Sequence, residues 1–432
     1  MLPYLARRQR LQNTLQSGII ILPTAPERVR NNDCLYPYRF DSHFYYLTGF
    51  TEPEAVMVQV LGEQPRTLLF CREKHPEREI WDGFRYGPEQ AKTRFGFDEA
   101  HSIDTLSEQL CVLLADQPRI YYPLGQDRYW DKRLMRILNQ IRAQARKGAR
   151  TPTQMIDIRV MLDEMRLIKD ADEIAILRQA GNINAGAHRR AMQATQAGLY
   201  EYSIEAELLH EYTRHGSRFP AYSTIVASGA NACTLHYTDN NAQLNNGDLL
   251  LIDAGCEIAG YASDVTRTFP VNGRFSSAQK DVYEIVLAAQ LAAIETIRPG
   301  NTWNTAQEAA LHILVQGLID LGLCQGSVAG VIESKTYQQF YMHGIGHWMG
   351  LDVHDVGEYK QDGEWRHLVP GIVMTVEPGL YIRPADNVPR HLENIGIRIE
   401  DDILVTEAGY ENLSAAAPKT INDIETVMAQ GI

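Results

Sequence analysis

Short apolar runs alternate with helical patterns along the first third of the chain. The strand-like runs cover residues 18–23, 56–60, 67–70 and 119–122. Residues 105–115 and 133–142 instead repeat their apolar positions at the spacing of a helix that buries one face. Strands that alternate with helices in this way predict an α/β domain at the N-terminal end of the chain.

A polar, basic stretch at residues 144–153 interrupts this pattern. Beyond it, Asp170 and Glu173 have the three-residue spacing of a capping box, which predicts the start of a helix. We therefore expect an N-terminal domain over residues 1–168 and a second domain over residues 169–432, in which long helices alternate with strand pairs. The first domain contains no GxGxxG or GxxxxGK motif that would cradle a phosphate.

The composition of the chain limits which molecules it can bind and which compartment it occupies. The 432 residues carry a net charge of −13, and an acidic surface repels nucleic acid while it tolerates peptides with a protonated amino terminus. The six cysteines are irregularly spaced and form no CxxC pair, so we expect reduced thiols in a cytoplasmic protein. No apolar stretch of about 18 residues is present, which predicts that the chain neither spans a membrane nor starts with a secretory signal.

Two aspartates occur eleven residues apart in predicted strands. Residues 249–254 form an apolar run with Asp253 near its end, and residues 258–269, after an expected turn at Cys256 and Glu257, form a second strand with Asp264. Neighbouring antiparallel strands would hold both carboxylates close together, which is costly unless a cation lies between them. Either aspartate taken alone could equally be an ordinary strand-end residue.

Three histidines fall within residues 343–355, at His343, His347 and His354. The first two have the spacing of the zinc-binding helix HExxH, but the glutamate is missing and two nearby glycines disfavour a helix. We expect instead a glycine-rich turn whose backbone lies close to something bound. A single histidine is most often a core residue, whereas three in one short turn favour a functional site.

Two further strands end in glutamates. Residues 372–377 form an apolar run that ends at Glu377, and residues 395–400 alternate so that Arg398 and Glu400 share one face. An exposed face with paired charges would show the same alternation, but it would not explain why Glu377 ends a buried run.

Together these segments supply four carboxylates and one imidazole. Mostly oxygen ligands with one imidazole suit hard or borderline divalent ions such as manganese, cobalt or iron, with zinc as an alternative. Four negative charges exceed what one divalent ion balances, so a pair of ions fits better, as in two-metal hydrolases. The candidate ligands are Asp253, Asp264, His347, Glu377 and Glu400.

These motifs resemble those of the "pita-bread" metallopeptidases, a group that includes methionine aminopeptidases, prolidases and aminopeptidase P. The matching segments are LLLIDAG, SDVTRTF, HGIGHWMGLDVHDVG, TVEPGLY and IRIEDD, with the five ligand types in the family's order. The resemblance implies an α+β pita-bread catalytic domain after the α/β N-terminal domain. That N-terminal domain, which methionine aminopeptidases lack, resembles the one in aminopeptidase P and prolidase. The segments YPYRF (36–40), YLTGFTEPEA (46–55) and HWMGLDVHDVG (347–357) are most similar to bacterial aminopeptidase P. Creatinase shares the fold but lacks the ligands.

The resemblance also implies a role for each ligand. Asp264 and Glu400 would bridge both ions, and Asp253 would complete the shell of one of them. His347 and Glu377 would complete the shell of the other. Glu377 would in addition act as general base and proton shuttle.

Further residues acquire roles only through the resemblance. His236 and His354 would hydrogen-bond the scissile carbonyl, and His343 would line the proline side of the cleft. Arg398 and Tyr381 would hold Asp253. Trp81, in the N-terminal domain, would reach the cleft of a neighbouring subunit, which implies a homo-oligomer, either a dimer or a tetramer.

The implied activity is hydrolysis of the bond between an N-terminal residue and a following proline in peptides, with two divalent ions, expected to be Mn²⁺. A prolidase that acts only on Xaa-Pro dipeptides would share the same ligands, so the ligands leave that alternative open. A binding protein that has lost catalysis is the other alternative, and the complete ligand set argues against it.

Overall fold

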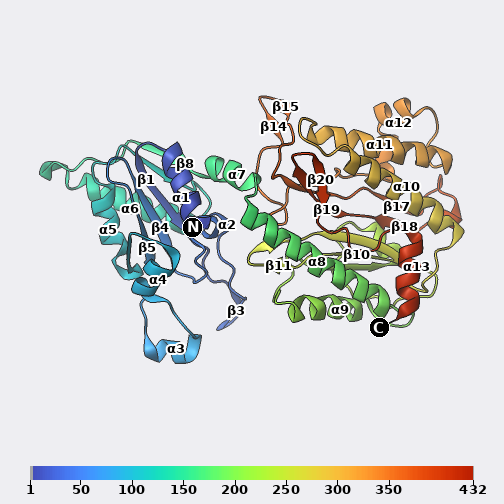
Figure 1. Cartoon of the computed structure of the whole chain (residues 1–432), viewed down its shortest axis with the longest axis horizontal. Helices are drawn as coiled ribbons and strands as arrows, with labels where there is room; N and C mark the ends of the chain where they lie inside the picture. The colour runs from blue at the N-terminus through green and yellow to red at the C-terminus, as the bar shows by residue number, and fades with distance from the viewer. Residues whose placement is uncertain (1–2, 432) are drawn as a thin grey trace. The chain divides into compact units, whose positions relative to one another are not determined.

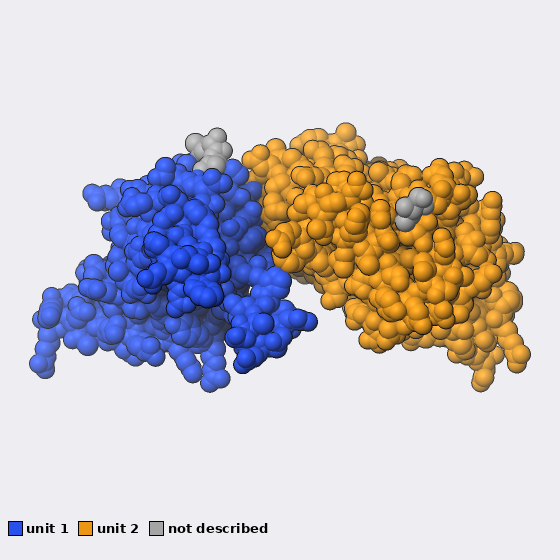
Figure 2. All heavy atoms as spheres, turned by 90° about the horizontal axis from the view of Figure 1, so that it is seen from below, with its two compact units in different colours: residues 1–163 blue, residues 164–432 orange. Residues whose placement is uncertain are grey.

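The computed structural model describes residues 3–431, which divide into two compact units, Met1–Asp163 and Glu164–Ile432 (Figure 2). The division falls a few residues before the boundary expected near residue 168, inside helix α7 (Arg159–Leu167).

The N-terminal unit is built on one mixed six-stranded sheet with the order β6-β5-β4-β1-β7-β8. The central strand β1 is antiparallel to β4 and parallel to β7, and all six of its residues are buried, as expected for a continuous apolar run. The four predicted strands are all present, which confirms the apolar runs as strands. The sheet comprises β1 (Gly18–Pro23), β4 (Val56–Leu61), β5 (Arg66–Cys71), β6 (Glu99–Ser102), β7 (Arg119–Tyr122) and β8 (Gln154–Asp157).

Helices cover this sheet. Both predicted helices are confirmed, as α5 (Leu106–Leu114) and α6 (Arg128–Arg142), and their apolar faces share one buried cluster with the sheet. Helix α6 begins earlier than the pattern indicated because the Asp127 side chain caps its first turn. The remaining elements are α1 (Pro3–Thr14), α2 (Ser42–Thr48), α3 (Pro76–Asp82), α4 (Gly87–Phe95) and the short hairpin β2 (Val29–Asn31) and β3 (Cys34–Leu35).

The C-terminal unit contains two three-stranded sheets, one longer strand pair and two short hairpins, flanked by the helix pairs α8–α9 and α10–α11 (Figure 1). The strands are β9 (Ile225–Ser228), β10 (Leu249–Ala254), β13 (Val265–Pro270), β16 (Val373–Val376), β17 (Gly379–Ile382), β18 (Ile395–Arg398), β19 (Asp401–Thr406) and β20 (Gly409–Asn412). The helices are α8 (Ala171–Ala194), α9 (Glu201–Arg214), α10 (Ser277–Glu295), α11 (Trp303–Asp320), α12 (Val328–Ser334) and α13 (Ile421–Gln430). A further hairpin joins β14 (Lys360–Gln361) and β15 (Glu364–Trp365).

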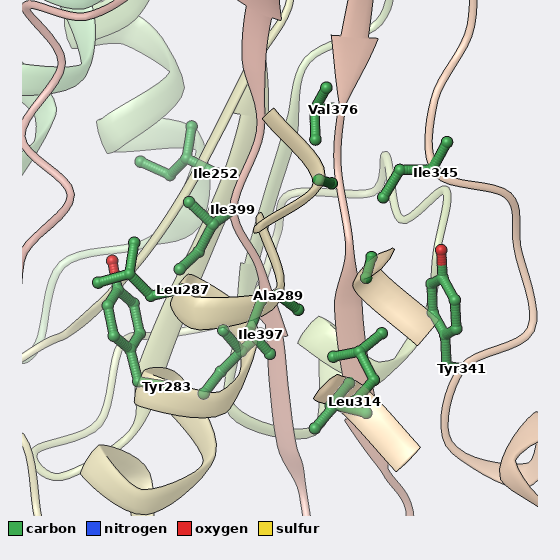
Figure 3. Packing of buried hydrophobic residues seen from close by; sticks show 14 of the residues in the cluster. Ile252, Tyr283, Leu287, Ala289, Leu314, Tyr341, Ile345, Val376, Ile397 and Ile399 are labelled. Carbon is green, nitrogen blue, oxygen red and sulfur yellow. The ribbon is translucent and has the colours of Figure 1, made fainter. Parts of the chain in front are cut away.

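Local sequence signals explain several of these elements. Helix α8 starts with the predicted capping box, in which Asp170 accepts from the Glu173 amide and Glu173 accepts from the Asp170 amide. In β18 and just after it, Ile397 and Ile399 pack into the main core beside α10 (Figure 3). The alternation predicted for residues 395–400 is therefore confirmed, and its polar face is left for the site.

The strand predicted over residues 258–269 is wrong in its first half. The structure has two short strands, β11 (Glu257–Ile258) and β12 (Tyr261–Ala262), before β13 begins. The turn lies at Ala259 and Gly260, both with positive φ, rather than at Cys256 and Glu257. A two-residue hairpin turn of this kind needs left-handed backbone, which glycine adopts freely and alanine rarely does, so the pattern gave little sign of it.

Two predictions from composition can be compared with the structure. All six cysteines are free, as predicted. Among the described residues, every helix is either too short or too polar to cross a membrane.

Candidate metal centre

A cavity of about 380 Å³ opens in the C-terminal unit, and the predicted chemistry converges on it. Its lining includes all five candidate ligands, together with the three histidines and the two residues expected to support them. These are Asp253, Asp264, His347, Glu377 and Glu400, with His236, His343, His354, Tyr381 and Arg398. Residues that lie up to 164 positions apart in the sequence thus share one cavity.

Strands β10 and β13 bring the two aspartates together. They pair antiparallel, with Asp253 opposite Thr266, so that Asp264 lies just before the paired segment. The hydroxyl of Tyr222 is 2.6 Å from Asp253 Oδ1 and is also hydrogen-bonded to Asp264. The backbone amide of Asp264 donates to both carboxylate oxygens of Asp402, at 3.2 and 3.1 Å. The predicted proximity of the two aspartates on neighbouring strands is confirmed.

The turn that carries His347 is held against strand β16. The Thr375 amide donates to the His347 carbonyl at 2.9 Å, and the Glu377 amide donates to the Ile345 carbonyl at 2.8 Å. A Cβ at Gly346 would lie 2.1 Å from the Thr375 carbonyl oxygen, so only glycine fits there. The glycine-rich turn is confirmed, but at Gly346 the close approach is to the protein's own strand rather than to something bound.

This pairing sets His347 beside the carboxylates. Its Nε2 is 3.3 Å from Asp264 Oδ2 and 3.8 Å from Glu377 Oε1. Its Nδ1 is 3.0 Å from the Trp348 carbonyl, which can accept the other ring proton and fix the tautomer. Atoms of Asp264, His347 and Glu400 all lie within 4.8 Å of one another, a spacing that suits a shared ion.

Arg398 ties the opposite wall together. Its Nη2 donates to Asp253 Oδ2 at 2.6 Å, and its Nη1 donates to the Tyr381 hydroxyl at 3.0 Å. Nearby, the Thr266 hydroxyl donates to Glu400 Oε2 at 2.7 Å. Arg398 and Glu400 are only 3% and 1% exposed, which excludes the alternative of a solvent-exposed, salt-bridged face.

The buried carboxylates repel one another. Burial, together with neighbouring carboxylates, raises the pKa of Asp264 and of Glu400, and burial raises the pKa of Glu377 to about 7. Burial acts in the same direction on Asp253, but the positive charge of Arg398 outweighs it and lowers that pKa. One arginine leaves most of the negative charge unbalanced, and divalent cations would balance it.

The carboxylates also favour a positive charge on His347. Burial alone would lower its pKa, but the hydrogen bond and charge of Asp264 raise it to about 9. A metal ion can take the place of such a proton on the imidazole, because metal ligation requires the neutral ring. The donor set therefore fits a divalent metal centre.

The other three histidines line the cavity outside this cluster. The His354 ring packs edge-on against His347, with 4.3 Å between ring centroids, and His343 Nε2 accepts from the Tyr381 hydroxyl at 2.8 Å. Burial lowers the pKa of His343 to about 4, and burial and the charge of His347 lower that of His354. The neutral His354 ring can donate one N–H to a bound group, whereas the single N–H of His343 is directed at the Gly344 carbonyl.

Three residues of the site were not singled out from the sequence: Tyr222, Thr266 and Asp402. Tyr222 follows no periodic pattern and carries no signal in a single sequence. Thr266 and Asp402 each lie in a segment that contains a candidate ligand, and the two consecutive carboxylates after Glu400, Asp401 and Asp402, were a usable signal. Trp81 is placed differently: it lies on α3 of the N-terminal unit, 85% exposed, and is not part of the cavity lining.

Known proteins resemble this chain over both units. Residues 175–407 match the family model of metallopeptidase family M24, and residues 4–121 match that of the aminopeptidase P N-terminal domain. An Xaa-Pro aminopeptidase of Haemophilus influenzae is 47% identical, over 98% of this chain and 96% of its own length.

Solved structures agree over nearly the whole chain. The aminopeptidase PepP of Pseudomonas aeruginosa superimposes with a TM-score of 0.98 at 49% identity, covering 99% of this chain and 97% of its own. A zinc-substituted aminopeptidase P of Escherichia coli in complex with product gives a TM-score of 0.97 at 45% identity, with 99% and 98% covered. The predicted fold class, an α/β N-terminal domain before a pita-bread catalytic domain, is confirmed.

Proposed function

The chain belongs to metallopeptidase family M24, and we propose which of its residues carry out its reaction. Its activity is that of an Xaa-Pro aminopeptidase, which removes an N-terminal residue that precedes proline. The observation that carries the residue assignment is the convergence of four carboxylates and one imidazole on a single cavity.

Two divalent ions fit the ligand set, and we propose manganese because most of the donors are oxygens. Asp264 and Glu400 would hold both ions, Asp253 would complete the shell of one, and His347 and Glu377 would complete the shell of the other. The description of the E. coli relative as zinc-substituted fits a resident ion other than zinc. When bound, the ions lower the pKa of the attacking water and polarise the scissile carbonyl.

Glu377 handles the proton. The bond before proline is a tertiary amide without an N–H, so its nitrogen must receive a proton before proline can leave. Glu377 directly follows β16 at the cavity wall, with its Oε1 3.8 Å from His347 Nε2, and it takes a proton from the attacking water and carries it to the proline nitrogen.

The histidines act on the substrate. His236 and His354 donate to the carbonyl oxygen as its negative charge develops, which stabilises the transition state. His343 lines the side that receives proline, held by its hydrogen bond to Tyr381. Arg398 holds Asp253 in place through a 2.6 Å hydrogen bond and is in turn bonded to Tyr381.

We assign residues 1–168 to oligomerisation and residues 169–432 to catalysis. Ile80 and Trp81 on α3 and Phe84 just after it are 81%, 85% and 60% exposed, and such an apolar patch is typical of an interaction surface. In this proposal the patch packs on another copy of the chain in a dimer or tetramer, where the Trp81 indole lies against substrate proline. The six free thiols fit a reducing compartment, and we place the enzyme in the cytoplasm.

Activity on Xaa-Pro-Yaa peptides after chelation and re-metallation tests the proposal. We expect chelation to abolish cleavage and manganese to restore it best. Full activity in metal-free protein would contradict the mechanism. A parallel assay with Xaa-Pro dipeptides addresses the prolidase alternative. A prolidase would cleave the dipeptides alone, whereas an aminopeptidase also cleaves the longer peptides.

A further inference from the structure

Glu201 is a fully buried carboxylate outside the cavity lining. It is the first residue of α9, and its side chain is 0% exposed. One oxygen, Oε1, accepts from the Ser228 amide and hydroxyl, both at 2.7 Å, and from Asn231 Nδ2 at 3.1 Å. The other, Oε2, accepts from the Tyr237 hydroxyl at 2.8 Å and from the Ala242 amide at 2.9 Å. Five hydrogen bonds thus end on one carboxylate.

All five donors belong to one connection, residues 228–242, which leads from the end of β9 toward β10. They are neutral groups, so the negative charge is stabilised by hydrogen bonds and by its place in the first turn of a helix. Burial of a carboxylate without an opposing cation is costly, and a neutral side chain would have avoided that cost. The arrangement therefore points to a role for the connection that Glu201 holds.

The same connection presents His236 to the cavity. Leu235, His236 and Thr238 all line it. In the described part of the chain, the His236 ring forms no hydrogen bond of its own, and its side chain is exposed toward the cavity. The position of the imidazole thus depends on the backbone around it rather than on a partner for the ring.

Tyr237 links the carboxylate to that backbone. It directly follows His236, and its ring packs against a small buried cluster that includes Ala232 and Cys233. Burial and the hydrogen bond to Glu201 raise the pKa of Tyr237 to about 12, so its hydroxyl remains protonated and continues to donate. The bonds from Ser228, Asn231 and Ala242 hold the connection on both sides of His236.

We propose that Glu201 is a positioning residue that orients His236 toward the scissile carbonyl by tying the 228–242 connection to α9. The inference rests on the role given above to His236, and it adds a buried residue without substrate contact to the machinery that stabilises the transition state.

The test is a double-mutant cycle in the metal-loaded enzyme. Glu201→Gln keeps the shape of the side chain but offers an amide to the donors on one side. We expect kcat/KM for an Xaa-Pro-Yaa peptide to fall roughly 10- to 100-fold, as for a misplaced catalytic group, with metal content unchanged. In a His236→Ala background the same substitution should have little further effect, because the group that it misplaces is already gone.

Two companion variants sharpen the cycle. Glu205→Gln is the matched control. Glu205 lies one turn further along α9 and, among the described residues, accepts one hydrogen bond from the same connection, from Asn240 at 3.1 Å, so activity should stay near the wild-type value. Tyr237→Phe removes only the bond nearest His236 and should give a smaller loss that also disappears in the His236→Ala background. It keeps the test usable if Glu201→Gln folds poorly.

The outcomes distinguish the positioning role of Glu201 from the proposed role of His236. An equal loss from Glu201→Gln in both backgrounds would show general damage and overturn the positioning role. Wild-type activity in Glu201→Gln beside an impaired His236→Ala enzyme would also overturn it, while the role of His236 stands. A fully active His236→Ala enzyme would contradict the proposed function itself, and the positioning role with it.

Discussion

The guanidinium of Arg166 donates to the carboxylate of Asp355 at 2.6 Å, at a point where their side chains are only 2% and 0% exposed. Lys169 Nζ donates to the second oxygen of Asp355 at 2.9 Å. Because Asp355 directly follows His354, these ion pairs tie the turn that carries three of the site's histidines to the end of α7 and to the short segment between α7 and α8. The turn contains no helix and depends on such contacts for its shape.

We expect Asp355→Asn to lower the free energy of unfolding by about 3–5 kcal/mol, because it removes the buried negative charge that Arg166 and Lys169 share. Urea denaturation of the metal-loaded protein would measure this loss. The control is Asp352→Asn, which also contacts Arg166 but has a side chain that is 40% exposed. It should cost less than about 1 kcal/mol. Equal effects of the two substitutions would show that burial of the pair does not matter.

Glu400→Ala should remove the metal centre rather than merely slow the reaction. Glu400 is 1% exposed and is proposed to contact both ions, so one truncation removes a bond to each. Elemental analysis of the purified variant should find fewer than two ions per chain, and Asp264→Ala should behave alike. Full occupancy by two ions in either variant would refute the bridging role.

His354→Ala should leave the bound metal in place, in contrast to Glu400→Ala. Its ring packs edge-on against His347, with 4.3 Å between ring centroids, and it is not one of the five proposed ligands. We expect kcat to fall roughly 10²-fold or more, as for loss of an oxyanion donor, with metal content unchanged. If the ions are lost instead, His354 is a ligand and the assignment of His347 must be revised.

Features of the fold and the site could be predicted where a short stretch of sequence is enough to indicate them. The capping box of Asp170 and Glu173 predicts the start of α8. The alternation around Arg398 distinguishes the strand face that holds Glu400 from the face that packs into the core. Asp253 and Glu377 were recognisable because each lies at or near the end of an apolar run, where a charged residue requires an explanation, and His347 because it is one of three histidines in a short segment.

The remaining features depend on contacts between distant segments. Tyr222 reaches Asp253 and Asp264 only because the chain folds back over 31 and 42 residues, which no local pattern records. The break before β13 depends on left-handed backbone at Ala259, an unusual conformation for alanine. Glu201 looks like an ordinary first-turn helix residue until its five donors are in place.

The last prediction concerns His188, a fully buried histidine of α8. Burial, with a further contribution from the charge of Arg267, lowers its pKa from 6.5 to about 3. Between about pH 3 and pH 6.5 the His188 ring therefore stays neutral in the native protein, whereas in the unfolded chain it binds a proton. The resulting stability is fully present above about pH 6.5 and declines as the pH falls toward about 3, by up to about 1.4 kcal/mol per pH unit.

His188→Gln removes this titration, so its free energy of unfolding should fall less steeply than that of the wild type between about pH 6.5 and about pH 4. Urea denaturation at several pH values, with chelator present for every variant, gives both slopes without a contribution from metal release. His210→Gln, at an exposed position of α9, is the matched control and should keep the wild-type slope. If His188→Gln also keeps that slope, a charged His188 is tolerated in the native core, and its burial does not contribute to the loss of stability in acid.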